Sequence, residues 1–235
     1  MNTTSNICDR LAANHRSVLD RIAAACRRVG RDPASVTLVA VTKSARPEWI
    51  QALVDIGQAE LAENRPQQLI ERATHIAGPI QWHLIGHLQR NKARQILPLV
   101  SLIHSVDSLR LLTTLDQLAA NLNLQPRVLL EVNVSGEASK DGFRADELLA
   151  AWDQVIACRH LRVEGLMTMA PLSDRPADAR PPFAGLRELR DQLRTRSPDA
   201  VPLPHLSMGM SGDFEVAIEE GATLVRVGSA LFEGM

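Results

Sequence analysis

The sequence contains no tyrosine at all, and aromatic residues make up only 3% of its 235 positions. Long apolar runs are also missing, since none approaches the roughly 18 residues that a membrane-spanning helix needs. Residues 1–17 are polar and lack the apolar segment of a secretory signal peptide. We therefore expect a cytoplasmic protein that has no membrane partner.

Cysteine is scarce, and neither sign of charge dominates. Cys8, Cys26 and Cys158 are widely spaced, which argues against a disulfide framework or a zinc site, and we expect Cys8 and Cys26 to be small core residues of a helix. The 26 basic and 27 acidic residues leave a formal net charge of −1. A nearly neutral protein without interleaved aromatics gives no reason to expect nucleic-acid binding, so the basic run at 89–94 predicts a solvated helix face.

What the sequence does contain is a regular alternation of apolar, β-branched runs with helical segments. The expected strands cover 36–42, 59–63, 80–86, 102–106, 127–134, 161–169, 204–210 and 223–228. A helix at 6–29 precedes them, and clear helices between them cover 108–122 and 145–159. Strands that alternate with helices pair in parallel through right-handed crossovers. The pattern predicts an α/β fold, a single (β/α)8 TIM-type barrel with an extra N-terminal helix.

The main alternative is an open doubly wound sheet. That fold would need a glycine-rich turn after the first strand, and KSARPE stands there at 43–48. We expect one barrel domain over residues 1–235, with no second domain and as a monomer. The proline-rich stretch 170–183 is expected to be an exposed loop.

Unusual residues gather where the expected strands end. In such barrels the functional site lies at the carboxyl ends of the strands, so these side chains could converge on one pocket. The residues in question are Lys43, Glu63, Asn64, His83, Gly86, Asn133, Met167, Met169, Ser207, Met208, Arg226 and Gly228.

Lys43 directly follows the apolar run VAVT. A partly desolvated lysine has a lowered pKa, and its neutral amine can attack a carbonyl to form a Schiff base. The alternative is a lysine that extends into solvent or pairs with Glu63.

Two segments near the C-terminus suggest an anion site. SMGMSGDFE places Ser211 near one helix start, and RVGSALF places Gly228 and Ser229 near another. Backbone N–H groups and hydroxyls at helix starts bind phosphate, and barrels often hold it after strands seven and eight. Simple helix capping by Ser211 and Ser229 is the alternative.

Arg226 lies between valines, where a buried guanidinium needs an acceptor. Either a carboxylate such as Glu164 or a ring nitrogen of a ligand would serve. His83 and His87 straddle a turn at Gly86, so no metal site is expected. Four methionines could line a cofactor pocket or fill the core, and they are Met167, Met169, Met208 and Met210.

Seven segments in order make the sequence similar to a known family. They are VAVTKS, ENRPQQ, WHLIGHLQRNK, NVSGEASKDGF, GLMTMAP, HLSMGMSGDFEVAI and VRVGSALFEG. From about residue 10 onward, the chain resembles the pyridoxal phosphate homeostasis proteins, whose barrel is like the N-terminal domain of alanine racemase. Two positions depart from the family pattern, since Arg65 stands where tyrosine is frequent and His87 where proline is common.

The resemblance implies pyridoxal 5′-phosphate bound as a Schiff base on Lys43. It implies that Ser211, Gly228 and Ser229 hold the phosphate and that Arg226 faces the pyridine nitrogen. Asn64, His83 and Met208 are the remaining expected pocket residues.

Two functions remain open at this stage. One is a carrier that holds the cofactor in vitamin B6 homeostasis and could hand it to apo-enzymes. The other is an amino-acid racemase, which in the related barrel enzymes uses a lysine and a tyrosine on opposite faces of the substrate. The sequence has no tyrosine and ends at Met235 directly after the eighth strand, which favours the carrier, although His83 or His205 could replace the second base.

Overall fold

The computed structural model describes residues 3–136, 141–171, 173–196 and 201–235. Eight parallel strands close into a barrel in chain order, because β1 pairs with both β2 and β8. The strands are β1 Thr37–Val41, β2 Glu60–Glu63, β3 Gln81–Leu84, β4 Leu102–Val106, β5 Arg127–Glu131, β6 Arg162–Met167, β7 His205–Ser207 and β8 Leu224–Val227. The predicted (β/α)8 barrel is confirmed.

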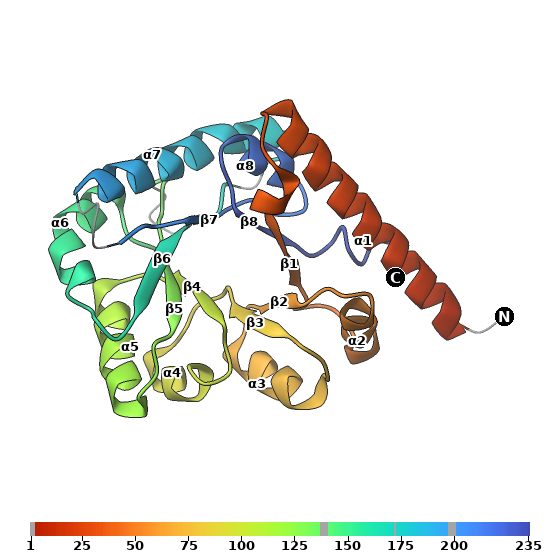
Figure 1. Ribbon diagram of the computed structural model, residues 1–235, viewed down its shortest axis with the longest axis horizontal. Coiled ribbons are helices and arrows are strands. Elements are labelled where there is room, and N and C mark those ends of the chain that lie inside the picture. The colour runs from red at the N-terminus through yellow and green to blue at the C-terminus, as the bar shows by residue number, and fades with distance from the viewer. Residues whose placement is uncertain (1–2, 137–140, 172, 197–200) are drawn as a thin grey trace.

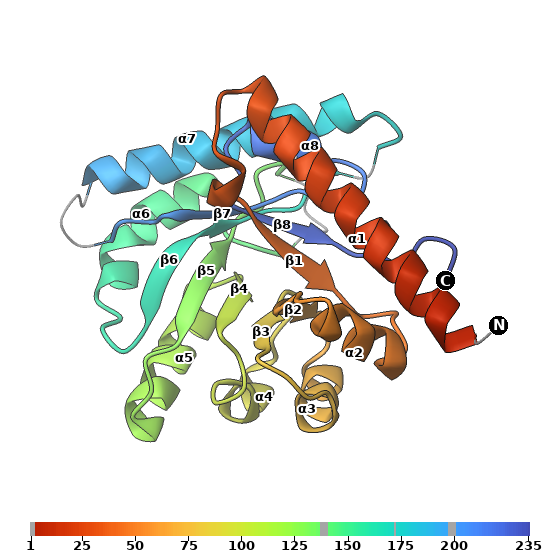
Figure 2. The ribbon, with the colours of Figure 1, turned by 45° about the vertical axis from the view of Figure 1, so that its right-hand side comes forward.

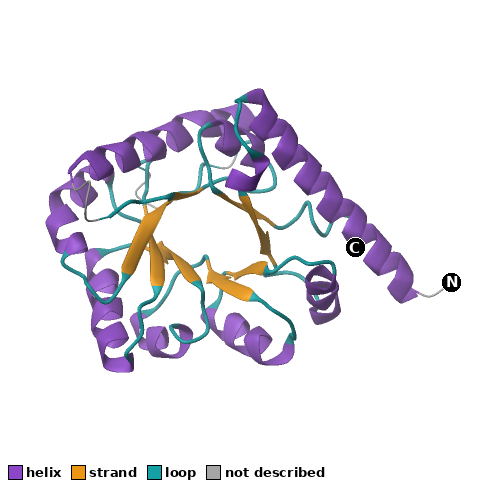
Figure 3. Cartoon of the chain, in the orientation of Figure 1, coloured by secondary structure: helices purple, strands orange, loops and turns teal. Residues whose placement is uncertain are grey.

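Helices surround this ring of strands on the outside (Figure 3). They are α1 Thr3–Arg28, α2 Pro47–Asp55, α3 Pro66–His75, α4 Arg90–Ile96, α5 Leu109–Leu122, α6 Ala145–Ile156, α7 Arg180–Arg196 and α8 Phe214–Glu219, with short 3-10 helices at Pro33–Ser35 and Pro176–Ala179. No helix in the described ranges is both long and apolar enough to cross a bilayer.

The extra N-terminal helix α1 lies along the outside of the barrel and packs against α2 and α8 (Figures 1 and 2). It buries Leu11, Val18, Ile22 and Cys26 at helical spacing on one face. Burial raises the pKa of the Cys26 thiol, as expected for a core residue. Cys8 is exposed, so its predicted core position is wrong.

Most strands end earlier in the chain than the apolar runs from which we predicted them. The predicted ends at residues 42, 86, 134, 169 and 210 become Val41, Leu84, Glu131, Met167 and Ser207. Residues beyond these ends leave the sheet but several stay buried, as Met208 does, so the apolar pattern continues after the strand hydrogen bonds end.

The predicted loop at 170–183 is partly helical. The 3-10 helix Pro176–Ala179 leads directly into α7, which begins at Arg180. Pro181 and Pro182 therefore stand in the first turn of a helix, where the missing N–H groups have no intrahelical partner to lose.

Side chains alternate between two cores, as the period of a strand requires. In β1, Leu38 and Ala40 belong to the large core between the sheet and the helices. Val39 and Val41 belong to a smaller cluster together with Ala62, Leu102, Leu129, Met167 and Leu224. Because those residues come from strands all around the ring, the smaller cluster is the interior of the barrel.

Candidate functional site

Lys43 stands at the mouth of the barrel, the end where the carboxyl ends of the strands meet. It follows β1 in a tight turn that is closed by a 2.8 Å hydrogen bond from Ala45 N to the Thr42 carbonyl. Lys43 is exposed, and its amine forms no hydrogen bond or ion pair within the described ranges. The partial burial that we predicted for the Lys43 amine is therefore not observed, and the amine is accessible to a ligand.

The turn that carries Lys43 is held by Arg72 from α3. The Arg72 guanidinium donates to the Thr42 carbonyl at 2.6 Å and to the Ala45 carbonyl at 2.9 Å, on either side of Lys43. It also forms a buried ion pair with Glu63, whose other contact is the Thr42 hydroxyl. Glu63 therefore pairs with Arg72, and the alternative of a Lys43–Glu63 pair is wrong.

The loops after β7 and β8 meet beside this turn, as predicted. The Ser211 hydroxyl oxygen accepts from the backbone N–H groups of Gly228 at 3.2 Å and Ala230 at 3.3 Å. Gly228 packs on β1, since a Cβ there would lie 3.2 Å from the Val41 carbonyl oxygen. These amides and the Ser211 hydroxyl that they hold lie, with the exposed Ser229, beside the end of β1 that leads into the Lys43 turn.

The local structure of these two loops differs from the prediction. Helix α8 begins at Phe214, after Ser211, and successive turns rather than a helix follow Gly228. Gly209 makes the sharp bend toward α8 with φ at +93°, and a Cβ there would lie 2.8 Å from the Phe214 Cα. Only glycine allows this close approach at that backbone conformation.

Asn64 directly follows β2 and is half-buried at the same mouth. Its strand is joined to the Lys43 strand, because Thr42 N donates to the Ala62 carbonyl at 3.0 Å. Gly86 presses on the Asn64 backbone so closely that a Cβ would overlap the Asn64 carbonyl oxygen. Asn64 thus lies beside the Lys43 turn, at the end of the barrel where the sequence predicts it.

Arg226 is buried inside the barrel and is held by neutral acceptors. It donates to the Ser207 hydroxyl at 2.6 Å and to the Thr168 carbonyl at 2.9 Å. The suggested partner Glu164 instead accepts from Arg127 at 2.7 Å, so that alternative is wrong. Burial lowers the pKa of Arg226 to about 10, and the guanidinium therefore stays charged at neutral pH.

Glu131 is a site residue that the sequence analysis missed. It ends β5, is 7% exposed, and faces the same interior as Arg226. Burial and then the negative charge of Asp107 raise its pKa to about 7, against the opposing effect of Arg226. The signal in the sequence was a carboxylate directly after the apolar run VLL, within an otherwise apolar strand.

His83 does not lie free at the mouth. Its Nδ1 is 2.8 Å from His104 Nε2, and its Nε2 is 2.6 Å from Glu60 Oε2 at the first residue of β2. Both ring nitrogens are thus engaged by the protein, so neither is free to form a hydrogen bond with a ligand. The predicted role of His83 as a cofactor contact is corrected accordingly.

Met208 also moves out of the predicted pocket. It is fully buried and packs in the outer core between sheet and helices, because Ser207 before it takes the inward position. Met167 lies in the barrel interior, whereas Met169 is 43% exposed. The methionines therefore do not form one lining.

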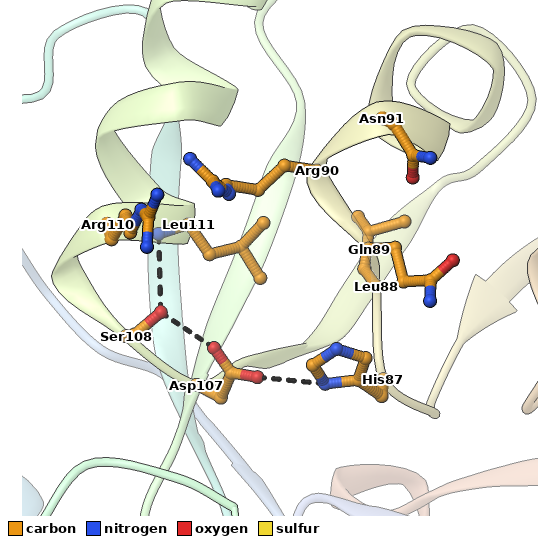
Figure 4. A pocket seen from close by; sticks show the side chains of 9 residues that line it. All are labelled: His87, Leu88, Gln89, Arg90, Asn91, Asp107, Ser108, Arg110 and Leu111. Carbon is orange, nitrogen blue, oxygen red and sulfur yellow. Dashed lines mark hydrogen bonds and ion pairs between the residues drawn. The ribbon is translucent and has the colours of Figure 1, made fainter.

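A pocket with a volume of about 400 Å³ lies outside the barrel between the starts of α4 and α5. Asp107 stands between His87 and Ser108 in this pocket, with His87 Nδ1 at 3.1 Å (Figure 4). Arg90 and Arg110 line it as well. His87 thus interacts with Asp107 rather than with His83, and the described residues hold no group of three metal-ligating side chains.

Comparisons with known proteins show which family the chain belongs to. The family described as alanine racemase, N-terminal domain, matches residues 17–235. A pyridoxal phosphate homeostasis protein of Aquifex aeolicus is 42% identical over 97% of both chains. The Escherichia coli protein of the same name is 37% identical over 94% of this chain and 95% of its own.

Solved structures show the same relationship. PipY of Synechococcus elongatus, whose structure has PLP bound, superposes with a TM-score of 0.82 at 34% identity, covering 96% of this chain and 99% of its own. Alanine racemase of Clostridium difficile shares the fold alone, with a TM-score of 0.75, 15% identity, 95% of this chain covered and 56% of its own. The chain belongs to the family of the alanine racemase N-terminal domain and, within it, to the pyridoxal phosphate homeostasis proteins.

Proposed function

We propose that this protein binds pyridoxal 5′-phosphate at the mouth of its barrel and acts in the homeostasis of that cofactor. The observation that carries the proposal is the meeting of three features at one end of the barrel. They are the unengaged amine of Lys43, the Ser211 hydroxyl that the Gly228 and Ala230 amides orient, and the buried charge of Arg226. The PLP bound to PipY, a homologue over nearly the whole chain, supports the same cofactor.

The residues at the mouth fit this cofactor chemically. Pyridoxal phosphate supplies an aldehyde, a phosphate and an electron-withdrawing ring when it is bound. In our proposal Lys43 binds the aldehyde carbon through its amine, and Ser211, Gly228 and Ser229 hold the phosphate by N–H and O–H donors. Asn64 lines the pocket beside Lys43.

Arg226 would face the ring nitrogen of the cofactor. A guanidinium at that place disfavours a second positive charge, so it keeps the nitrogen unprotonated. An unprotonated ring withdraws electrons less strongly and supports carbanion chemistry poorly. This arrangement favours holding the cofactor over catalysing reactions of amino acids.

We propose that the protein is a carrier rather than a racemase. The complete absence of tyrosine removes the usual second base, and His83, considered above as a substitute, has both ring nitrogens engaged. Exchange of the Cα hydrogen of L-alanine in deuterated water tests this. We expect no exchange above the rate of free pyridoxal phosphate, and faster exchange would support the racemase. Apo-enzymes that need the cofactor are the proposed recipients.

The covalent assignment has a direct test, because the sequence has only three lysines, Lys43, Lys92 and Lys140. Incubation with pyridoxal phosphate and reduction with borohydride should add one cofactor to the intact mass, and peptide mapping should find it on Lys43. Lys43→Ala should lose the adduct, whereas Lys92→Ala, on α4, should keep it. An adduct on Lys92 or Lys140, or none, would contradict the proposal.

A further inference from the structure

A continuous series of polar side chains crosses the barrel interior and ends at Arg226. We call it the interior network, and its members are Arg226, Ser207, His104, His83 and Glu60, from β8, β7, β4, β3 and β2. Successive contacts measure 2.6, 2.8, 2.8 and 2.6 Å. The first four residues are buried, and the Glu60 side chain is 34% exposed at the opposite end of its strand from the mouth.

The hydrogen positions in the network follow from the chemistry of its members. A guanidinium only donates, so the Ser207 oxygen accepts from Arg226. With the Glu60 carboxylate accepting at the other end and both imidazoles neutral, the Ser207 hydrogen is placed on His104 Nδ1. His104 then carries its hydrogen on Nε2 and donates it to His83 Nδ1. His83 in turn donates from Nε2 to the Glu60 carboxylate. Every donor therefore points away from Arg226.

This polarity requires both histidines to be neutral, and the surroundings of His104 favour that state. Burial first, and then the basic groups that face it, hold the pKa of His104 well below its usual value. The groups that face it are His83, Arg226, His205 and Arg127. The Glu164 carboxylate lies outside the network. It accepts a hydrogen bond from Arg127 and lies 3.8 Å from His205 Nε2.

We propose that His83 and His104 are positioning residues for the cofactor pocket, and this rests on the proposed function. They orient the Ser207 hydroxyl so that its oxygen, not its hydrogen, faces Arg226. Ser207 and the Thr168 carbonyl then fix the guanidinium from two sides. The direction in which Arg226 presents its positive charge to the ring of the cofactor depends on this support.

Two measurements test the proposal. In the protein without cofactor, ¹⁵N-resolved NMR of the imidazoles should show His83 and His104 both protonated on Nε2 only; a proton on His104 Nδ1 at neutral pH would overturn the polarity. With the cofactor, His104→Leu should raise the dissociation constant by about tenfold, through the lost hydrogen bond. Glu60→Gln exchanges the acceptor at the end of the network for an amide that can donate to His83 Nε2, so it should also raise the dissociation constant, by about threefold.

Glu164→Gln is the matched control, because it removes a carboxylate at the same end of the barrel outside the network. It should leave the affinity at the wild-type value. Wild-type affinity in both His104→Leu and Glu60→Gln would overturn the proposal, and if His104→Leu does not fold, the affinity of Glu60→Gln and the imidazole protonation pattern decide. A missing Lys43 adduct in the wild type would instead contradict the proposed function, which separates the two failures.

Discussion

Glu131 illustrates how a single carboxyl group inside the barrel can make stability depend on pH. Its pKa is raised from 4.5 to about 7 because burial and Asp107 disfavour its charge more than Arg226 favours it. Between these two values the native state binds more protons than the unfolded state does. The free energy of unfolding therefore falls as the pH rises through this window, by at most about 3 kcal/mol.

Replacing Glu131 by glutamine should remove this pH dependence. At pH 8 we expect Glu131→Gln to raise the free energy of unfolding by about 1–3 kcal/mol, since the buried charge is gone. Near pH 4.5 the variant and the wild type should be nearly equal. Urea denaturation at both pH values measures the difference, and an equal difference at the two would show that Glu131 titrates normally.

At the scale of elements, helix α3 controls the turn at the end of β1. Arg72 reaches from α3 to the carbonyls of Thr42 and Ala45, and its charge is balanced by the buried Glu63. Burial raises the pKa of Glu63, while Thr42 and Arg72 lower it. The loop that carries Lys43 is thus attached to a helix rather than left to its own backbone.

Arg72→Met should therefore lower the free energy of unfolding by about 3–5 kcal/mol, because Glu63 is left buried without a partner. Adding Glu63→Gln should restore part of that loss, as expected for a coupled pair. Arg65→Ala, on the exposed residue that precedes α3, is the control and should change stability by less than about 0.5 kcal/mol. Equal losses in Arg72→Met with and without Glu63→Gln would argue against the coupling.

At the scale of the whole molecule, the first helix ties the two ends of the chain together. Asn14 in α1 donates to the carbonyls of Leu231 and Glu233 at 3.1 and 3.0 Å. Arg28 on α1 and Arg180 on α7 both form ion pairs with Glu219 of α8. The C-terminal segment that follows Gly228 is thereby held by α1, which supports the loop that we propose to bind the phosphate.

The monomeric state stays a prediction, and the described surface agrees with it. Large apolar side chains are exposed only at scattered positions of the described residues, namely Leu19, Val29, Ile56 and Met169. Such single exposed residues are usual in monomers. Light scattering coupled to size exclusion should give 25.8 kDa at all micromolar concentrations, and a mass that rises with concentration would refute the monomer.

The architecture, and the end of the barrel at which the candidate site lies, could be predicted from the sequence alone. Alternating strand and helix periods leave few topologies open, and the carboxyl ends of parallel strands must share one face. The placement of Lys43, Asn64, Ser211 and Gly228 at one end of the barrel followed from that rule.

The side chains that meet inside the barrel could be identified only from the three-dimensional structure. The two-residue period of a strand predicts whether a side chain such as His83 or Met208 faces the barrel interior or the helices only when the strand ends and the register are known. A shift of one residue moves every side chain to the other face of the sheet. Partners such as Arg72 with Glu63, or His83 with His104, lie on different elements, so no local pattern encodes them. The contacts between interior side chains depend on the closure of the barrel, which brings β2, β3, β4, β7 and β8 around one interior.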